Sequence, residues 1–284
     1  MSERETGKRE AGSAPTLPKL RAEIDRIDAT MHALLIERGE IIGELIKVKR
    51  TQESGAAFRP AREASMMRRI VERHRGILPL DTVESIWRVI IATFTYVQAP
   101  YAVHADFSAG DAAVRDSARF HFGFTVPLSA HLGAAAVVAA VAQSRGDLGL
   151  VPAGALAGTG AWWAALEAET GPKIIARLPF VERADHPASL PLFVVSRPIA
   201  ADGAVTEVQT WSIRVAGWSA GAARAVATLA EVIAVPHGEF DGAALLASIA
   251  PGRSLDELTA ALVATGASVR STALVGGHAT RYTV

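Results

Sequence analysis

The sequence predicts a multi-domain protein: an all-α segment of three helices, then an α/β region that ends in a ferredoxin-like βαββαβ unit. Two observations predict this fold class. Up to residue 100, apolar side chains recur every three or four positions, as they do on one face of an α-helix. Beyond that point, short runs of β-type residues alternate with helical stretches. A chain of 284 residues is long enough for two or three domains.

Composition limits the possible functions. Half of the residues are hydrophobic and the formal net charge is zero, so we expect a globular protein without a nucleic-acid partner. Cysteine is absent, which excludes disulfides and thiolate chemistry. The longest run of small apolar residues, at 132–142, is about half of what a bilayer span needs. We expect a soluble, cytoplasmic protein with no membrane partner.

The N-terminal stretch contains a tail and one long helix. Residues 1–16 are polar and charged, which predicts a disordered tail rather than a signal peptide. Residues 17–50 predict a single amphipathic helix, and turn formers at 51–57 predict a reversal of the chain. The apolar positions of the helix are Leu20, Ile24, Ile27, Met31, Leu34, Ile41, Leu45 and Val48.

Two shorter helices follow. Pro60 suits the first position of the second helix, Glu63 lies in its first turn, and its apolar pattern ends before Gly76. The third helix begins near residue 80 and ends before Pro100. The first helix is about 50 Å long by helical rise, so the two shorter helices cannot cover its whole apolar stripe. We therefore expect a second chain to cover the remainder.

The middle region, residues 101–200, alternates between the two element types. We expect a glycine-bearing turn at 154–160 and a linker or hairpin at 197–208. Alternation of this kind implies a mainly parallel sheet covered by helices. The expected strands are 101–107, 124–128, 148–151, 173–178 and 192–196, and the expected helices are 111–122, 134–143 and 162–169.

The last segment, residues 206–284, gives the βαββαβ order. Ser254 is the expected N-cap of its second helix, and Gly266 is the expected stop. We predict domains at 17–100, 101–200 and 206–284. The expected strands are 209–215, 232–236, 244–249 and 268–274, and the expected helices are 220–229 and 254–264.

The helical segment contains a set of separated sequence matches. They are Leu20-Arg21, Leu34-Leu35-Ile36-Glu37-Arg38, Lys47-Val48-Lys49, Arg59-Pro60-Ala61-Arg62-Glu63, and Ile90-Ile91 followed by Gln98. In these the segment resembles the AroQ-type, all-α chorismate mutases. The resemblance implies an intertwined homodimer of three-helix chains that converts chorismate to prephenate for phenylalanine and tyrosine synthesis, with no cofactor.

The resemblance also implies a role for each matched polar residue. Arg21 and Arg38 would clamp the two carboxylates of chorismate. Lys49 and Gln98 would donate to the ether oxygen of the breaking bond. Glu63 would accept from the ring hydroxyl, and Arg62 would hold the neighbouring network.

Helix geometry assigns the basic residues to two pockets. Arg38 and Lys49 lie three turns apart on one helix face, so they can converge on one ligand from about 16 Å. Arg21 lies about 25 Å before Arg38 and roughly 100° off that face. We therefore expect Arg21 to enter the pocket of the partner chain.

Two substrate-binding positions depart from the family pattern. Arg59 stands where an aspartate precedes the glutamate by four residues, and Phe94 stands where a serine precedes the glutamine by four. Because Phe94 shares a helix face with Gln98, we expect one hydrogen bond to a substrate carboxylate to be missing. An amide at position 98 donates at any pH, so we expect no loss of turnover between neutral and mildly alkaline pH from this group.

The rest of the chain resembles a reduced prephenate dehydratase region followed by an ACT-like unit. The similar text lies at 146–152, 193–195 and 274–278. The dehydratase signature Thr-Arg-Phe is replaced by Pro191-Leu192-Phe193, and the two effector motifs of ACT domains are missing. Two alternatives remain open: a bifunctional mutase and dehydratase, or a non-catalytic regulatory or scaffolding protein of the same pathway.

Other polar features favour ordinary structural roles. The basic residues at 68–75 are interleaved with apolar ones, as on a solvated helix face. The eight histidines show no paired spacing for a metal, and Ser129 and His131 form no recognisable triad. We therefore predict no metal site.

Overall fold

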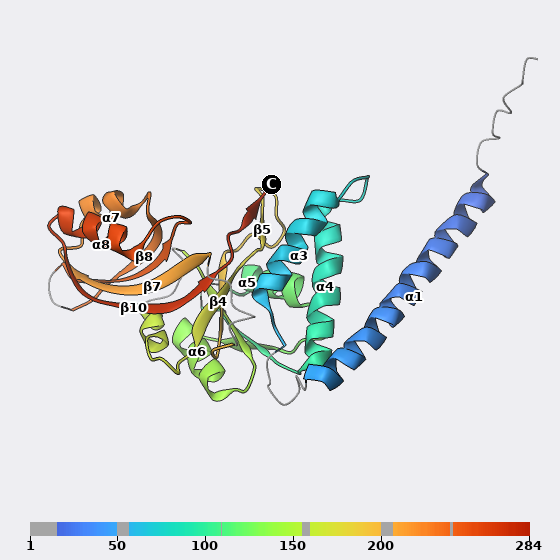
Figure 1. The fold of residues 1–284 in the computed structure, drawn as a ribbon, viewed down its shortest axis with the longest axis horizontal. Coiled ribbons are helices and arrows are strands. Elements are labelled where there is room, and N and C mark those ends of the chain that lie inside the picture. Colours follow the sequence, from blue (N-terminus) through green and yellow to red (C-terminus); the bar gives the residue numbers. More distant parts are fainter. Residues whose placement is uncertain (1–15, 50–56, 109, 155–159, 200–206, 239–240) are drawn as a thin grey trace, which may run out of the picture. The chain divides into compact units, whose positions relative to one another are not determined.

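The computed structural model describes residues 16–49, 57–108, 110–154, 160–199, 207–238 and 241–284 (Figure 1). The chain divides into two compact units, Met1–Lys49 and Arg50–Val284. Four predicted features lie wholly or mostly outside the described residues: the tail at 1–16, the reversal at 51–57, the glycine turn at 154–160 and the segment 197–208. Among the described helices, none combines the length and the apolar character needed to cross a membrane.

The first unit is the single helix α1 (Leu17–Lys49), which confirms the predicted long helix. Its apolar side chains are exposed to solvent in the described part of the structure. The exposed fraction ranges from 43% to 58% for the five apolar positions Leu20, Ile24, Ile27, Met31 and Leu34. A stripe of this extent is typical of a surface that another molecule covers.

Helices α3 (Pro60–Arg73) and α4 (Leu80–Gln98) begin the second unit, as predicted. Pro60 opens α3 and Glu63 lies in its first turn. The two helices do not have a core of their own: Met67 and Ile91 belong to the same buried cluster as Val103 and Ala105 of the first strand. Packing against the α/β region therefore supplies much of the stability of both helices.

A nine-stranded sheet runs through the rest of this unit, in the order β2-β1-β3-β6-β4-β10-β7-β9-β8. A small pair, β11 (Tyr282–Thr283) with β5 (Val181–Glu182), lies beside it. The nine strands are β1 (Val103–Asp106), β2 (Leu128–His131), β3 (Leu148–Pro152), β4 (Lys173–Leu178), β6 (Leu192–Ser196), β7 (Val208–Ala216), β8 (Ala230–Pro236), β9 (Ala243–Ile249) and β10 (Ser268–His278). The helical elements are α5 (Asp111–Phe122), α6 (Ala134–Gln143), the 3-10 helix η1 (Trp162–Leu166), α7 (Ala220–Val226) and α8 (Leu255–Ala264).

The expectation of a mainly parallel sheet at 101–200 is wrong. Strands β2, β1 and β3 pair in parallel, but β6 pairs antiparallel with both β3 and β4. The physical reason is the connection between β4 and β6, residues 179–191. It contains no helix that could carry the chain back to start a parallel strand.

Four elements also have a boundary that differs from the predicted one by three residues or more. The second strand is at 128–131 rather than 124–128, and Phe124 is 83% exposed in the turn before it. The element at 162–166 is a short 3-10 helix rather than a helix to 169, and α7 ends at 226 rather than 229. Strand β10 continues to 278 rather than 274.

Gly276 is the position at which β10 meets β4. A Cβ at this position would lie 2.0 Å from the Ile174 carbonyl oxygen, and its φ of +138° favours glycine. Only a glycine lets β10 approach β4 this closely, at the pair Gly276 and Ile174. The same sheet therefore continues from the middle region into the last segment, while the domain boundaries themselves stay a prediction.

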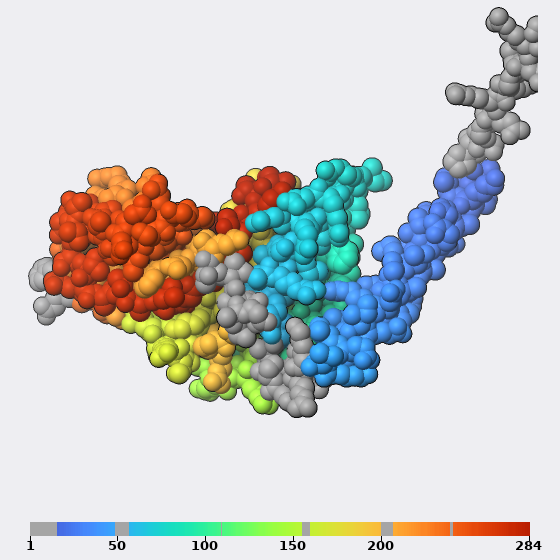
Figure 2. Space-filling view, in the orientation of Figure 1, coloured from blue at the N-terminus to red at the C-terminus, as the bar shows by residue number. Residues whose placement is uncertain are grey.

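The last segment has the predicted ferredoxin-like arrangement. Its four strands lie in the order β10-β7-β9-β8, with every neighbouring pair antiparallel. Ser254 caps α8 through a reciprocal capping box with Glu257, which confirms the predicted N-cap. Residues after β10 return to the helical part: the Arg68 guanidinium of α3 lies 5.5 Å from the centre of the Tyr282 ring. In the space-filling view, the red C-terminal end of the chain lies beside the cyan atoms of the helical part (Figure 2).

Candidate functional site

The predicted basic residues of the first unit are spread along α1. Arg21 is exposed near its start, and Arg38 is half-buried in its second half. Lys49 is the last residue of the helix, and its side chain lies outside the described part of the structure. One continuous helix carries all three residues, so the spacing used to separate Arg21 from Arg38 applies without interruption.

Three predicted residues lie at the start of α3. Arg59 immediately precedes the helix, is half-buried, and donates from Nη1 to the Phe58 carbonyl oxygen at 3.1 Å. Arg62 is exposed, whereas the neighbouring Glu63 is only 4% exposed. Successive helix positions differ by about 100°, which is why adjacent residues meet solvent and core respectively.

Glu63 forms a buried ion pair that the sequence did not reveal. The Arg88 guanidinium on α4 lies 2.7 Å from the Glu63 carboxylate, and its other nitrogens donate to the His121 carbonyl oxygen at 2.9 and 3.2 Å. Burial raises the pKa of the Glu63 carboxyl above its usual range, and the Arg88 charge opposes that rise. Arg88 stands inside an apolar helical run, and a charge at a core-facing position was the only signal that could have found it.

Gln98 and Phe94 lie one turn apart in the last part of α4, and both are half-buried. The Gln98 side-chain amide donates to the Phe94 carbonyl oxygen at 3.0 Å. An amide nitrogen carries two hydrogens, so this bond uses one of the two. The contact orients the Gln98 side chain back along its own helix.

A second buried network lies next to the first. Glu84, one turn before Arg88 on α4, is 1% exposed. Its carboxylate accepts from Arg183 at 3.0 Å and lies 3.3 Å from the His186 ring. Both partners come from the segment after β5, so α4 is tied to the α/β region by charged contacts as well as by apolar packing.

The predicted residues are divided between the two units of the chain. Residues of the set lie close along α3 and along α4, while Arg21, Arg38 and Lys49 belong to the other unit of the chain. At the position of the dehydratase signature, Leu192 and Phe193 are buried in β6. Within the described ranges, no group of three or more histidine or acidic side chains is placed to hold a metal ion.

Comparisons with known proteins find a family model that matches the helical part. Residues 20–99 match the family model described as chorismate mutase type II. A bifunctional chorismate mutase/prephenate dehydratase of Neisseria gonorrhoeae (strain ATCC 700825 / FA 1090) is 33% identical over 106 residues, which is 36% of this chain and 27% of the relative. The chain therefore spans about a quarter of the length of this curated relative.

Two solved structures share a distant likeness with the chain. One is described as GqqA, a novel type of quorum quenching acylases, with 17% identity and a TM-score of 0.40 over 63% of this chain and 95% of its own. The other is prephenate dehydratase from Streptococcus mutans, with 10% identity and a TM-score of 0.35 over 63% of this chain and 97% of its own.

Proposed function

We propose that the chain is a chorismate mutase, an isomerase that converts chorismate to prephenate in the cytoplasm. The observation that carries this proposal is the family match across residues 20–99, which includes α3, α4 and nearly all of α1. Within the matched range, the proposal assigns roles to Arg21, Arg38 and Lys49 of α1, to Glu63 of α3 and to Gln98 of α4.

The reaction is a unimolecular rearrangement that needs no nucleophile or proton shuttle. Its catalysis consists of holding the substrate in a compact reactive conformer and of placing fixed donors where negative charge grows. Arg38 is proposed to bind one substrate carboxylate, because a planar guanidinium matches a carboxylate with two parallel hydrogen bonds. Lys49 and Gln98 are proposed to donate to the ether oxygen.

Glu63 is proposed to accept a hydrogen bond from the ring hydroxyl of the substrate. Its Oε2 atom is held by Arg88, which restricts the side chain to one position. The second oxygen of the same carboxylate, Oε1, is fixed together with Oε2. Oε1 is the proposed acceptor for the substrate hydroxyl. Arg88 is then a positioning residue for Glu63 rather than a catalytic one.

The proposed active form is a homodimer in which Arg21 acts in the pocket of the partner chain. The exposed apolar stripe of α1 supports this arrangement, since a helix with such a stripe is stabilised when an identical helix covers it. Arg21 is exposed on the same helix, at a distance from Arg38 that one small ligand does not bridge.

The test is chorismate consumption and prephenate formation by the purified full-length chain. We expect turnover without added metal or cofactor. Absence of turnover would contradict the proposal and is the result expected of a non-catalytic regulatory protein. Formation of phenylpyruvate from added prephenate would identify the bifunctional alternative, which the replacement of Thr-Arg-Phe by Pro191-Leu192-Phe193 disfavours.

A further inference from the structure

The turn that joins α3 to α4, residues 74–79, has an exposed apolar tip. Ile77 is fully exposed at 103%, and the adjacent Leu78 is 47% exposed. In Figure 1 the turn lies at the end of the helix pair, and Figure 2 shows its atoms projecting from this part of the surface. Two adjacent aliphatic side chains at a projecting point offer a small apolar contact to another molecule.

The chain holds this tip in place with contacts of its own. Helix α3 ends where the His74 N–H donates to the Ile70 carbonyl oxygen at 3.0 Å. The His74 ring Nε2 lies 2.8 Å from the Leu78 carbonyl oxygen, and this contact closes the turn. Gly76 has a φ of +112°, a conformation that favours glycine. The turn is therefore a formed structure that presents Ile77 to solvent.

Three exposed arginines lie just before the tip. Arg69 and Arg73 are one turn apart on the same side of α3, and Arg75 follows in the turn. Arg69 and Arg75 donate to backbone carbonyl oxygens, and the Arg73 guanidinium lies 6.0 Å from the centre of the Trp87 ring. Among the described residues, none of the three arginines pairs with a carboxylate.

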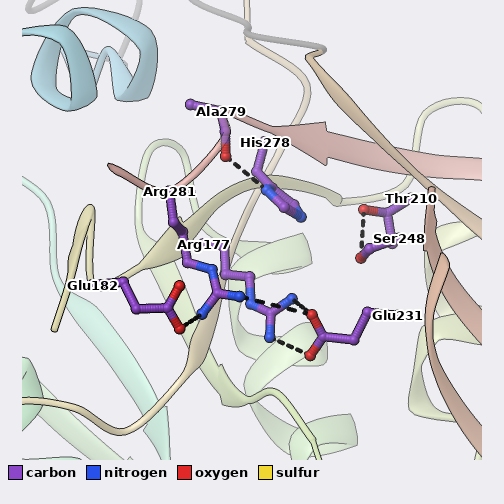
Figure 3. A network of polar contacts seen from close by, with 8 residues as sticks. All are labelled: Arg177, Glu182, Thr210, Glu231, Ser248, His278, Ala279 and Arg281. Atoms are coloured by element: carbon purple, nitrogen blue, oxygen red, sulfur yellow. Dashed lines mark hydrogen bonds and ion pairs between the residues drawn. The ribbon is translucent and has the colours of Figure 1, made fainter. Parts of the chain in front are cut away.

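Arginines in the α/β region are paired instead. In the network of Figure 3, Arg177 is held by Glu231 and Arg281 by Glu182. A guanidinium that has a carboxylate partner is neutralised in place, whereas an exposed guanidinium without one is available to an external anion. The segment 68–81 contains four arginines and two acidic residues, so its net charge is +2 with histidine neutral.

We propose that this tip binds the surface of a membrane that contains anionic lipids. Ile77 and Leu78 are placed among the first carbons of the acyl chains, and Arg73 and Arg75 among the lipid phosphates. Arginine suits a phosphate because its planar fork donates two hydrogen bonds. Trp87 is half-buried beside Arg73, and tryptophan favours the boundary between acyl chains and head groups.

The depth of such a contact agrees with the spacing of the arginines. A peripheral apolar surface enters the head-group region by about 5–10 Å. By helical rise, Arg69 lies about 6 Å behind Arg73. All three arginines therefore stay within about one Debye length of the lipid phosphates, where each basic residue adds to the attraction.

The size and shape of the tip favour a lipid surface over a protein or a nucleic acid. A stable protein interface buries about 800 Å² per partner around a central apolar cluster, more than two side chains at a projecting point supply. Nucleic-acid bases stack on aromatic side chains, whereas the most exposed residue of this turn is Ile77. A lipid surface accepts a shallow apolar point with basic residues behind it.

A membrane contact at this turn differs from the sequence-based expectation of no membrane partner. That expectation came from the apolar runs, which are too short to span a bilayer. A peripheral contact needs no spanning segment. It is also independent of the proposed mutase activity.

Flotation of the full-length chain with lipid vesicles tests the partner. The vesicles consist of phosphatidylglycerol, which is anionic, or of phosphatidylcholine, which has no net charge. We expect the chain to bind the anionic vesicles about tenfold more tightly or better, and to bind them less tightly as salt is added. No binding to phosphatidylglycerol vesicles, or equal binding to both kinds, would overturn the proposal.

Variants locate the contact. Ile77→Asn removes the apolar point and should weaken binding about tenfold, and Arg73→Gln should weaken it about fivefold. The matched control is Leu132→Asn, because Leu132 is an aliphatic residue outside the turn and is 85% exposed. It should leave binding unchanged. Unchanged binding in both Ile77→Asn and Arg73→Gln, or an equal loss in Leu132→Asn, would overturn the assignment to this turn.

A fluorescent label reports on the surroundings of the tip. The chain has no cysteine, so Ile77→Cys introduces a single thiol for a polarity-sensitive dye. We expect the emission to shift to the blue with phosphatidylglycerol vesicles, and the label on Leu132→Cys to show no shift. A blue shift that needs no vesicles and grows with protein concentration would assign the tip to a contact between copies of the chain and overturn the proposal.

Circular dichroism of each variant identifies any loss of fold. Chorismate turnover is expected to be the same in wild type and in all folded variants. Failure of this proposal is thus distinguishable from failure of the proposed mutase activity.

Discussion

The Arg88 guanidinium lies 2.7 Å from the Glu63 carboxylate, and the exposed fractions of the two side chains are 0% and 5%. The pair joins α4 to the first turn of α3, at a residue proposed to contact substrate. Opposite charges in such a core are costly to separate, since removing one leaves the other buried without compensation.

Arg88→Met should therefore destabilise the chain. We expect the free energy of unfolding in urea to fall by about 3–5 kcal/mol, because the Glu63 carboxyl loses its partner. Arg115→Met, which breaks an exposed pair with Asp111, should change it by about 0.5 kcal/mol or less. Adding Glu63→Gln to Arg88→Met should recover part of the loss, and equal stability of Arg88→Met and wild type would contradict the structural role.

Removing a donor or clamp from the proposed pocket should reduce turnover. We expect Lys49→Ala and Arg38→Ala each to lower kcat/KM for chorismate by about 10²–10³-fold, the usual effect of losing one preorganised donor. Arg26→Ala is the matched control, since Arg26 lies on the same helix and pairs with Glu23 at the surface. A comparable loss in Arg26→Ala would indicate damage to the helix rather than to a pocket.

Mixing two inactive chains should restore activity if Arg21 acts in trans. In a dimer of one Arg21→Ala chain and one Lys49→Ala chain, one pocket is intact and the other lacks both groups. Random exchange should thus recover roughly a quarter of wild-type activity, because half of the dimers are mixed and each has one good pocket. Activity that stays at the level of the separate variants would place Arg21 in the pocket of its own chain.

The proposed donor role of Gln98 leads to a prediction about how kcat/KM depends on pH. An amide does not titrate, so kcat/KM should stay flat from about pH 7 to about pH 9 in the wild type as far as this donor is concerned. Gln98→Glu should show a decline as pH rises, because a carboxyl donates to the ether oxygen only while protonated. A flat profile in Gln98→Glu would argue against a donor role at this position.

His278 should make the fold less stable in acid. Its folded pKa of about 4 lies below the unfolded value of 6.5, so the unfolded chain binds the extra proton between these two values. Stability from the neutral ring is complete above the unfolded pKa and is lost as pH falls toward the folded one. Between about pH 7.5 and about pH 5, the wild type should lose about 2 kcal/mol more unfolding free energy than His278→Asn. Parallel urea curves for the two proteins across this range would contradict the shift.

The sequence alone predicts the helices and the last unit well, because their signals are local. Pro60 and Pro100 bound the second and third helices, and Ser254 with Glu257 starts α8. Each of these acts through neighbours in the chain, so periodicity and capping chemistry are sufficient to find it.

Features that depend on contacts between residues far apart in the sequence could not be predicted from the sequence alone. Arg88 in an apolar helix and His278 at the end of a strand carry no local sign that they pair with, or lie near, groups far away in sequence. The direction of β6 depends on a connection without a helix, and the pairing of β10 with β4 depends on the close approach at Gly276. For the proposed pocket, the positions come from the family pattern, whereas the Glu63–Arg88 pair required a structure.

The position of β10 in the sheet has a consequence for how the chain folds during translation. Among the nine strands it comes last in the sequence, yet it lies between β4 and β7. While a ribosome is still translating the preceding residues, both neighbouring strands present an unpaired edge, and such edges are templates for aggregation. The nascent chain therefore remains exposed to misassembly until residues 268–278 emerge, and a premature stop before them would leave two half-sheets with open edges rather than a slightly shortened protein.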